Sequence, residues 1–340
     1  MENKLPTIRE IAKRLNVSVS TVSRALSDHP RIGLRTKMRV QELAKELNYE
    51  PNIQAIFFKQ KKTYVIGVIL PYIREEFFSE AIRGIETLAL EHDYTILLGQ
   101  SFDDQDREKK VIDAFKKQRV DGIIISLSKQ TNQFDHLRSM AKYDIPVVYF
   151  DRLPPFDDAH KVFCNLYKGT IEMVNWLFNK GHRRIAFING PEKILASKER
   201  LDGYIQAVSG RKLKIDMQLV ERTDLTKEST YQAMKNLFGL KNPPNAIISF
   251  NDYVHLDAVQ YAKQHHIKIN KDVLFVSYAN LPVTDYVAYP PIASLEQYPY
   301  HQGEKAMEIL MDIFAARIKN EEVATYRKEE IAATLVTARS

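Results

Sequence analysis

This chain of 340 residues has a single cysteine, few glycines and no long apolar run, and each shortage excludes a class of protein. Cys164 alone can form neither an internal disulfide nor a cysteine-rich metal site, which favours a reducing cytoplasm and a buried, hydrophobic role for the thiol. No apolar run approaches the roughly 18 residues of a membrane helix, and the N-terminus lacks the apolar segment of a secretory signal. We therefore expect a cytoplasmic protein with no membrane partner.

Sequence motifs for catalysis and cofactor binding are also missing. No two of the 12 glycines lie closer than seven residues, which excludes GxGxxG, and there is no P-loop. GxSxG and HExxH are absent, and the adjacent His265 and His266 are poorly spaced for a metal. We expect no cofactor and no metal. An enzyme stays open as an alternative, and steady turnover of a bound ligand would reveal it.

The charge that is present is unevenly distributed. The first 62 residues contain 13 Lys and Arg but only six Asp and Glu, whereas the remainder has 36 basic and 37 acidic residues. A chain of this length, with 44% hydrophobic and 27% charged residues, forms two or three globular units. The positive charge predicts that the small N-terminal unit contacts phosphate and that the large unit does not.

The N-terminal segment predicts three short helices. Thr7 and Glu10 form a capping box at the start of the first helix, and Ser18 can cap the second after a break at residues 16–18. A third helix follows the turn between Pro30 and Gly33. The apolar positions recur at helical spacing and can share a small core: Ile8, Ile11, Ala12, Leu15, Val22, Ala25, Leu26, Val40, Leu43, Ala44 and Leu47. The pattern is that of a helix-turn-helix unit.

The second helix carries the residues expected to read DNA. Its outward N-terminal side chains are small or form hydrogen bonds: Val19, Ser20, Thr21, Ser23 and Arg24. Arg can bond guanine O6 and N7, Ser can bond either base of a pair, and Val can contact a thymine methyl. The alternative is an ordinary exposed helix start. The positive charge of the N-terminal unit favours the first interpretation, in which this helix contacts double-stranded DNA.

From Tyr64 onward, apolar strands alternate with amphipathic helices. Helices are predicted at 78–91, 109–118 and 168–179. Strands are predicted in two series, at 64–70, 94–99, 122–127 and 146–150, and again at 184–188, 218–221, 246–250 and 273–277. Apolar strands separated by helices indicate parallel sheets covered on both faces. The repetition predicts two similar α/β lobes.

Polar residues follow the carboxyl ends of several of these strands, namely Asp151, Asn189, Asn251, Asp252 and Asn280. Ligands bind beyond these ends in open α/β sheets, so two facing lobes would form a polar cleft. Each of these residues taken alone can instead be a turn or a helix cap. Their recurrence in both series favours a cleft.

The N-terminal motifs resemble the headpiece of the LacI/GalR family of bacterial transcription regulators. The matching stretches are TIREIA from Thr7, VSVSTVSR from Val17 and LNYEPN from Leu47. The resemblance implies a homodimer on a near-palindromic operator, with a headpiece at residues 1–50 and a hinge helix at 51–63. It also implies DNA contacts by Thr7, Asn52, Ala55 and Phe58. Phe58 stands where the family usually places a leucine that enters the minor groove; packing of Phe57 and Phe58 between headpiece and core is the alternative.

The remainder, residues 64–340, is similar to the family's regulatory domain, which has the two-lobe fold of periplasmic sugar-binding proteins. The matching stretches are residues 180–191, 200–204, 250–252 and 294–297. The resemblance implies lobe crossings near Asn165, Ala293 and Arg327. The first lobe would then span about 64–164 and 293–326, and the second about 165–292 and 327–340. It places the effector among Phe77, Phe78, Asp151, Arg200, Asn251 and Gln297.

Three residues depart from the family pattern. Family members that bind sugars or purines often have a carboxylate at the position of Ala279, and purine binders have Arg and Thr at the positions of Ile194 and Ala196. We expect a transcriptional repressor controlled by a small molecule, in the first instance a sugar or sugar derivative. Two alternatives are a regulator with a vestigial cleft that a protein partner controls, and a small-molecule binding protein.

Overall fold

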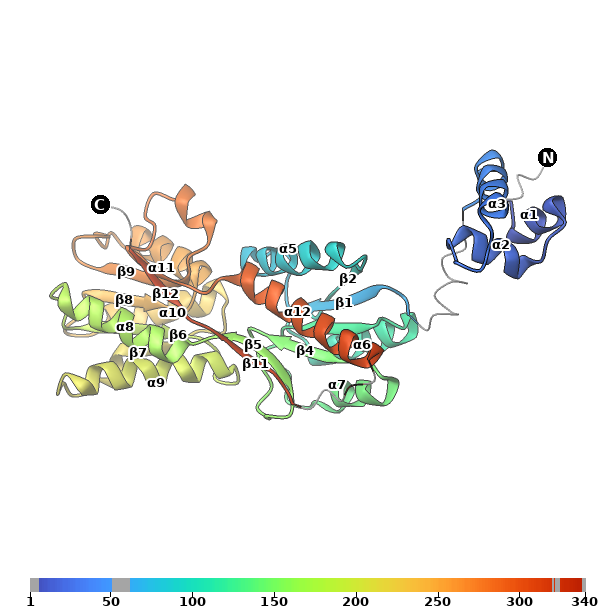
Figure 1. The fold of residues 1–340 in the computed structure, drawn as a ribbon. Coiled ribbons are helices and arrows are strands. Elements are labelled where there is room, and N and C mark those ends of the chain that lie inside the picture. The colour runs from blue at the N-terminus through green and yellow to red at the C-terminus, as the bar shows by residue number, and fades with distance from the viewer. Residues whose placement is uncertain (1–5, 51–61, 320, 322–324, 338–340) are drawn as a thin grey trace. The chain divides into compact units, whose positions relative to one another are not determined.

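The chain forms two separate units, divided between Thr63 and Tyr64. The computed structural model describes residues 6–50, 62–319, 321 and 325–337 (Figure 1). None of the helices within these ranges is long and apolar enough to cross a membrane.

The first unit contains three helices, α1 (Ile8–Leu15), α2 (Val19–Leu26) and α3 (Leu34–Glu46). The Thr7 hydroxyl caps α1 by accepting from the Glu10 amide at 3.3 Å. The Glu10 carboxylate pairs with Arg14 one turn later, at 2.8 Å. Asn16, in the left-handed region with φ 51°, ends α1 and allows the short turn that precedes α2.

Six small or branched side chains are buried where these helices meet. They recur at the predicted helical spacing, two on each helix: Ile11, Ala12, Val22, Ala25, Val40 and Ala44. The other predicted apolar residues, Ile8, Leu15, Leu26, Leu43 and Leu47, are half-buried around them. The three-helix headpiece predicted from the sequence is therefore confirmed.

The second unit contains two six-stranded sheets, one in each lobe. The first sheet has the order β11-β5-β4-β3-β1-β2 and is parallel throughout. The second has the order β12-β10-β9-β8-β6-β7, with only β12 antiparallel. The strands of the first sheet are β1 (Val65–Leu70), β2 (Thr95–Gln100), β3 (Gly122–Ile125), β4 (Val147–Phe150), β5 (His160–Cys164) and β11 (Lys328–Ile331). Those of the second are β6 (Ile185–Asn189), β7 (Val220–Arg222), β8 (Ala246–Ser249), β9 (Leu274–Ala279), β10 (Ala293–Glu296) and β12 (Thr334–Thr337).

Helices cover both faces of each sheet, as the apolar strands predict (Figure 1). The first lobe has α5 (Glu76–Glu91), α6 (Gln105–Gln118), α7 (Asp135–Arg138), η1 (Ser139–Tyr143) and α12 (Pro299–Ile318). The second has α8 (Leu166–Asn179), α9 (Leu195–Gly210), η2 (Met217–Leu219), α10 (Lys227–Phe238), α11 (Asp252–Gln264) and η3 (Pro282–Tyr286). Helices α5 and α12 approach closely because Gly84 and Gly303 face each other's helix. A Cβ at either position would lie 2.1 Å from a backbone oxygen.

The chain crosses between the lobes three times, and two crossings lie later than the sequence predicts. The first follows β5, near Asn165, as expected. Strand β10 pairs with β9, so residues 293–296 remain in the second lobe and the crossing follows Glu296. Strand β11 pairs with β5, so residues 328–331 remain in the first lobe and the third crossing follows Ile331. The assignment of these two strands was therefore wrong. Their backbone groups complete ladders in the lobe that the chain is about to leave.

Candidate functional site

Helix α2 presents most of the predicted DNA-reading side chains on the outside of the headpiece. Val19 is 42% exposed, and Ser20 and Arg24 are also exposed, whereas Thr21 and Ser23 are half-buried. The Arg24 side chain makes no hydrogen bond or ion pair with any residue that the structure describes, so its guanidinium is available. Val19 and Ser20 are at the start of α2, where small side chains allow close approach to base edges, and Arg24 follows in the last turn of the helix.

Hydrogen bonds at the start of α2 also hold the side chains of this surface in place. The Ser18 hydroxyl accepts from the Thr21 amide at 3.0 Å and lies 2.8 Å from the Ser20 and Thr21 hydroxyls. Thr7 is exposed at the start of α1. The predicted contacts Asn52, Ala55 and Phe58 lie outside the described residues.

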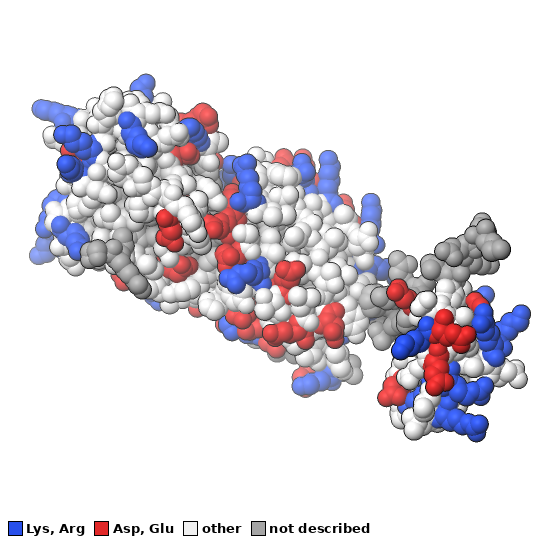
Figure 2. Space-filling model, turned by 90° about the horizontal axis from the view of Figure 1, so that it is seen from above, with Lys and Arg blue, Asp and Glu red and all other residues white. Residues whose placement is uncertain are grey.

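Basic side chains surround the helices of the headpiece. Two are paired with acids, Arg14 with Glu10 and Lys37 with Asp28, at 2.8 and 2.7 Å. Six others are exposed: Arg9, Lys13, Arg31, Arg35, Arg39 and Lys45. Figure 2 shows many basic side chains around a group of acidic ones on the visible face of the headpiece, and acids and bases interspersed over the core. The excess positive charge therefore lies at the surface of the unit that contains α2.

All six predicted effector residues line one cavity of about 50 Å³. The first lobe contributes Phe77 and Phe78 from α5 and Asp151 from the end of β4. The second lobe contributes Arg200 from α9, Asn251 at the start of α11 and Gln297, which follows β10. The cavity therefore lies between the lobes, at the carboxyl ends of their strands.

Arg200 is the main cation on the second-lobe side of the cavity. It is 4% exposed, and its guanidinium carbon lies 4.0 Å from the centre of the Phe250 ring and 4.4 Å from that of Tyr278. Nη1 donates to the Phe250 carbonyl at 2.8 Å, while Nε has no partner among the described residues. Burial lowers the pKa of this guanidinium. Because a buried donor without a partner is costly, the site suits a ligand with a hydrogen-bond acceptor.

Asp151 faces the cavity from the first lobe. Its backbone has φ 57°, and its Oδ2 accepts from the Ser126 hydroxyl at 3.2 Å. Burial raises the pKa of this carboxyl, and the neighbouring Arg152 and Arg200 oppose that shift. Arg152 Nε lies 4.0 Å from Asp151 Oδ2. A ligand between Asp151 and Arg200 would thus meet an acceptor on one side and a donor on the other.

The rings of Phe77 and Phe78 in the cavity wall are nearly perpendicular to each other. They are 8% and 2% exposed, and their planes meet at 87° with centres 5.4 Å apart. A flat ligand can therefore lie parallel to only one of them. The Asn251 side chain has a second role, since its Oδ1 caps α11 by accepting from the Val254 amide at 2.9 Å.

The three departures from the family pattern all face this cavity. Ile194, Ala196 and Ala279 line it together with Phe250 and Leu281. The backbone of Ala279 has φ 94°, a conformation that residues other than glycine rarely adopt. Residues in such conformations cluster at functional sites. The cavity therefore offers more apolar surface, and fewer hydrogen-bonding partners, than the pattern from which it departs.

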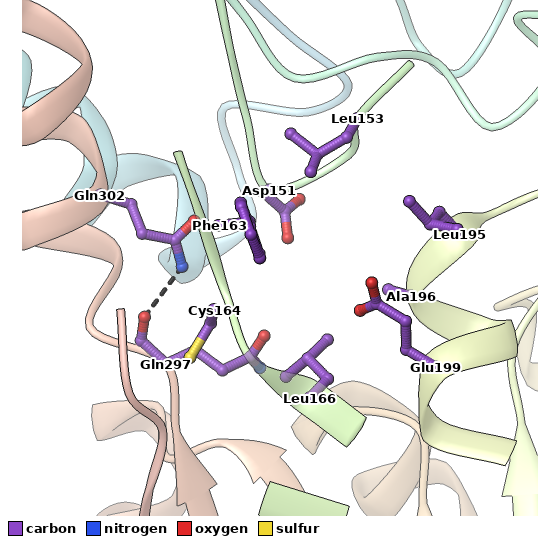
Figure 3. A pocket seen from close by; sticks show the side chains of 10 residues that line it. All are labelled: Asp151, Leu153, Phe163, Cys164, Leu166, Leu195, Ala196, Glu199, Gln297 and Gln302. Carbon is purple, nitrogen blue, oxygen red and sulfur yellow. Dashed lines mark hydrogen bonds between the residues drawn. The ribbon is translucent and has the colours of Figure 1, made fainter. Parts of the chain in front are cut away.

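A smaller cavity of about 10 Å³ adjoins the first and shares Asp151, Ala196 and Gln297 with it (Figure 3). Gln302 donates to the Gln297 carbonyl at 2.8 Å, and Glu199 lies on the opposite side. Burial raises the pKa of the Glu199 carboxyl. The space suits one water molecule. Cys164, predicted to be buried, also lines it; burial raises the pKa of its thiol to about 12, which makes it unreactive.

Three further polar cavity residues were missed in the sequence: Glu75, Arg152 and Tyr253. Arg152 follows Asp151 directly, so its position after a strand was an available signal. Of the other polar residues after strands, Asn189 and Asn280 have structural roles. Asn189 Oδ1 accepts from the Gly190 amide, and Asn280 Nδ2 donates to Glu296, both at 2.9 Å.

Comparisons with known proteins agree with this arrangement. Residues 63–339 match the family model of periplasmic binding proteins and the sugar-binding domain of the LacI family, and residues 7–52 match that of the lacI family of bacterial regulatory proteins. The chain is 32% identical to the HTH-type transcriptional repressor CytR of Escherichia coli K12, over 90% of this chain and 89% of the relative. It is 28% identical to the repressor PurR of Vibrio cholerae, over 94% and 93%.

Solved structures share the fold. The lac repressor dimer bound to operator and the anti-inducer ONPF has a TM-score of 0.83 at 20% identity and 98% coverage of both chains. The complex of the transcriptional regulator CelR with cellobiose has a TM-score of 0.71 at 23% identity, also with 98% coverage of both chains. The family models and the repressor CytR together account for both units, and the chain belongs to the LacI family of bacterial transcriptional regulators.

Proposed function

We propose that this protein is a repressor that binds a near-palindromic operator as a homodimer and is controlled by a small molecule between its lobes. The observation that carries the proposal is that six residues from five separate segments, selected through the family resemblance, line one interlobe cavity. In the same chain the headpiece displays Arg24, which has no side-chain partner among the described residues. Operator binding, the dimer and the effector each need their own test.

The first test concerns sequence-specific DNA binding. An operator is selected from a random duplex library with the full-length protein, and its affinity is measured at several salt concentrations. If Arg24 reads a guanine, Arg24→Ala weakens binding by about 1–3 kcal/mol. Affinity should also fall steeply with salt, with log K decreasing by about 0.9 per neutralised phosphate. Arg222→Ala, an exposed arginine of the second lobe, is the control. Equal affinities for both variants would refute base reading by Arg24.

The hinge has its own test. Phe58, as a wedge in the minor groove, would kink the centre of the operator. Phe58→Ala should then reduce both affinity and bending, measured by fluorescence energy transfer across the operator, while the core dimer persists. Unchanged bending would favour packing of Phe58 against protein.

The edge of the first sheet supports the proposed homodimer. Strand β2 is at the end of the sheet, and Leu97 and Leu98 on it are 37% and 40% exposed; Leu90 at the end of α5 is 65% exposed. Exposed leucines on an edge strand are a liability in a monomer and are suited to a subunit interface. Sedimentation of Leu98→Glu, compared with Leu213→Glu on the second lobe, tests this surface. A dimer unaffected by Leu98→Glu would place the interface elsewhere.

The cavity supports control by a sugar or sugar derivative. Asp151 can accept from hydroxyl groups, Arg200 and Asn251 can donate to them, and one phenylalanine face can cover an apolar side of the ring. The neighbour CelR was solved with cellobiose, which places carbohydrate binding among proteins of this fold. Because Ile194, Ala196 and Ala279 supply no polar group, the proposed ligand has few hydroxyls or carries an acceptor group opposite Arg200.

The size of the cavity links binding to movement. At about 50 Å³ it holds a few water molecules, whereas ligand pockets usually enclose 300–1,000 Å³. The lobes must therefore part to admit a metabolite, and a ligand that favours one arrangement shifts the population. A tenfold change in operator affinity requires about 1.4 kcal/mol of differential binding.

A metabolite screen, read out by operator release and by calorimetry, identifies the effector. Asp151→Ala and Arg200→Ala should each weaken its binding. If neither variant changes binding of an identified effector, the cavity assignment is wrong. If no metabolite acts, a regulator controlled by a protein partner is supported instead.

A further inference from the structure

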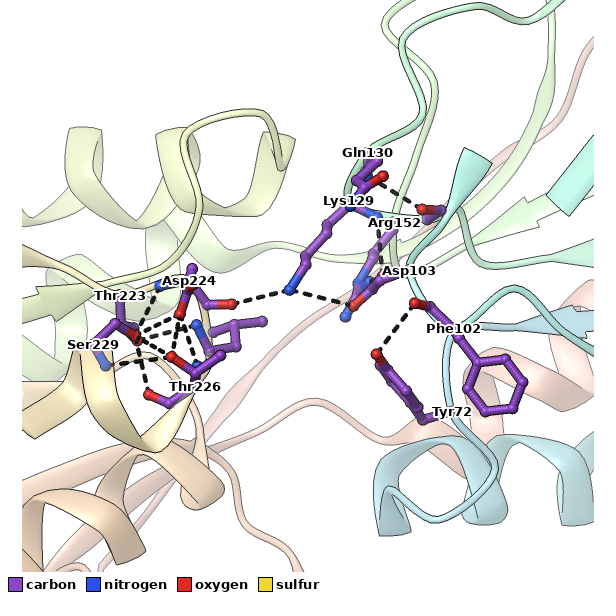
Figure 4. Close-up of polar contacts among 12 residues, drawn as sticks. Tyr72, Phe102, Asp103, Lys129, Gln130, Arg152, Thr223, Asp224, Thr226 and Ser229 are labelled. Atoms are coloured by element: carbon purple, nitrogen blue, oxygen red, sulfur yellow. Dashed lines mark hydrogen bonds and ion pairs between the residues drawn. The ribbon is translucent and has the colours of Figure 1, made fainter. Parts of the chain in front are cut away.

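One lysine links the two lobes at the rim of the cleft. Lys129, which follows β3 in the first lobe, donates from Nζ to the backbone carbonyl of Asp224 in the second lobe at 3.0 Å. The same Nζ lies 4.0 Å from Asp103 Oδ2 (Figure 4). Its side chain is 24% exposed, so the contact is partly shielded from water. Asp103, Lys129 and the Asp224 carbonyl are called the interlobe latch below.

The first-lobe side of the latch is held in place. Asp103 is 4% exposed, and its Oδ1 accepts from the Lys129 amide at 3.0 Å and from Arg152 Nη1 at 2.5 Å. A buried carboxylate with two such donors has a fixed position, and it lies where it attracts the Lys129 ammonium. The lysine is thus directed toward the second lobe instead of moving freely in solvent.

The second-lobe side is held by a turn whose polar side chains form several hydrogen bonds with one another. Asp224 Oδ1 accepts from the Thr226 amide at 3.0 Å and from the Thr226 and Ser229 hydroxyls, both at 2.6 Å. These hydrogen bonds lower the pKa of the Asp224 carboxyl to about 2. Leu225 has φ 71°, and its amide donates to the Thr223 hydroxyl at 3.0 Å. The turn therefore holds the Asp224 carbonyl toward Lys129 (Figure 4).

The latch lies far from the three crossings. The crossings leave β5, β10 and β11, which are at one end of the two sheets, whereas β2 and β7 are at the other. Asp103 follows β2 and Asp224 follows β7. Four strand spacings, or about 19 Å, separate β5 from β2 and β10 from β7. A rotation of the lobes about the crossings moves this end most, so a contact here resists opening with the longest lever arm.

The latch is also connected to the cavity. Arg152, which holds Asp103, lies 4.0 Å from Asp151 and lines the cavity where the effector is proposed to bind. The charged groups alternate in sign from Asp151 through Arg152 and Asp103 to Lys129. A ligand that donates to Asp151 weakens the hold of Asp151 on Arg152 and strengthens the pairing of Arg152 with Asp103.

We propose that the interlobe latch sets the population of the closed cleft, with Lys129 as its gating residue, although Lys129 touches no ligand. The role in effector control rests on the proposed function; the role in closure does not. Other hydrogen bonds between the lobes involve neither Lys129 nor Asp224: the Val283 amide donates to the Glu76 carboxylate at 2.9 Å, and the Glu76 amide donates to the Tyr253 hydroxyl at 3.1 Å. Loss of the latch therefore shifts an equilibrium and leaves both lobes folded.

Fluorescence energy transfer across the cleft in the full-length protein tests the proposal. Cys164 is 5% exposed, so Lys117→Cys on α6 and Lys235→Cys on α10 can be labelled selectively. Labelled chains are mixed with excess unlabelled chain, so that transfer reports one subunit only. Lys129→Met should shift the closed-to-open ratio about tenfold toward open, as expected for loss of a hydrogen bond from a charged donor. Lys129→Arg should keep most of the closed population.

Lys109→Met is the matched control, because Lys109 pairs at 3.4 Å with Asp106 in its own lobe. Asp224→Asn should give an intermediate shift, since it loosens the turn but leaves the carbonyl. If Lys129→Met matches the wild type, or if Lys109→Met opens the cleft equally, the latch is refuted. These measurements use neither DNA nor effector, so failure here leaves the proposed function standing. Failure of the operator selection would equally leave the latch standing.

Discussion

The candidate sites of the headpiece and of the core are assembled in opposite ways. In the headpiece the candidate reading surface comes from one short stretch, residues 19–24, on a capped helix. In the core the six predicted cavity residues lie in or directly beside five elements from two lobes. The positions of the side chains on α2 are fixed by residues close in sequence. The positions of the cavity residues depend instead on the packing of all the layers between them.

The two units also differ in what they bury. The described headpiece buries six apolar side chains and no polar one. The core buries four apolar clusters together with charged and polar groups, among them Asp252, His255 and Arg200. We therefore expect acid to lower the stability of the core. We expect the loss of single apolar groups to lower the stability of the headpiece most strongly.

The largest expected effect is that of acid on the core. Burial lowers the pKa of His255 from about 6.5 to about 4, and its Nε2 lies 2.9 Å from the Tyr289 carbonyl. Because the unfolded chain takes up this proton first, the contribution of His255 is present above pH 6.5 and is lost as pH falls toward 4. The loss is about 3 kcal/mol.

Urea unfolding of the core at pH 7 and pH 4.5 measures this effect. His255→Gln should reduce the pH dependence, whereas His266→Gln, at an exposed position, should leave it unchanged. Equal pH dependence in both variants would show that other groups govern the acid response, and the contrast between the units would then not rest on this histidine.

A pair of identical substitutions compares the two apolar cores. Val22 in the headpiece and Val276 in the second lobe are both fully buried. Each Val→Ala change removes two methyl groups and costs about 2 kcal/mol locally. Because the headpiece has so few buried contacts, Val22→Ala should unfold it at 37 °C, while Val276→Ala only lowers the melting temperature of the core. Calorimetry with separate headpiece and core transitions distinguishes the two; equal shifts would mean that the headpiece is stabilised by more than its small core.

The smallest effect concerns the cap that positions the candidate reading helix. Ser18→Ala removes the acceptor of the Thr21 amide and should cost the headpiece about 1 kcal/mol, whereas Ser18→Gly should cost only a few tenths. Thermal melting of the headpiece transition measures both. An alanine variant as stable as the glycine variant would show that α2 is held by packing alone.

Much of this molecule follows from residues that are close together in sequence. Thr7 and Ser18 start their helices where the sequence predicts, because a hydroxyl can reach an amide three residues ahead. The eight predicted core strands are present with ends shifted by one or two residues, since an apolar run bounded by turns has few alternatives. The six cavity residues were found through a family resemblance, because spacing alone does not bring Phe77 and Arg200 together.

The sequence by itself determined the two units, the positive headpiece, the capped second helix and the alternation of strands and helices, since these depend on charge and periodicity over a few residues. Tertiary structure decided the rest. Strands β10 and β11 remain in their lobes because their ladder partners are there. Arg200 is held between Phe250 and Tyr278, and Lys129 reaches Asp224 across 95 residues of chain. Such contacts form only when whole layers have packed, so no local pattern contains them.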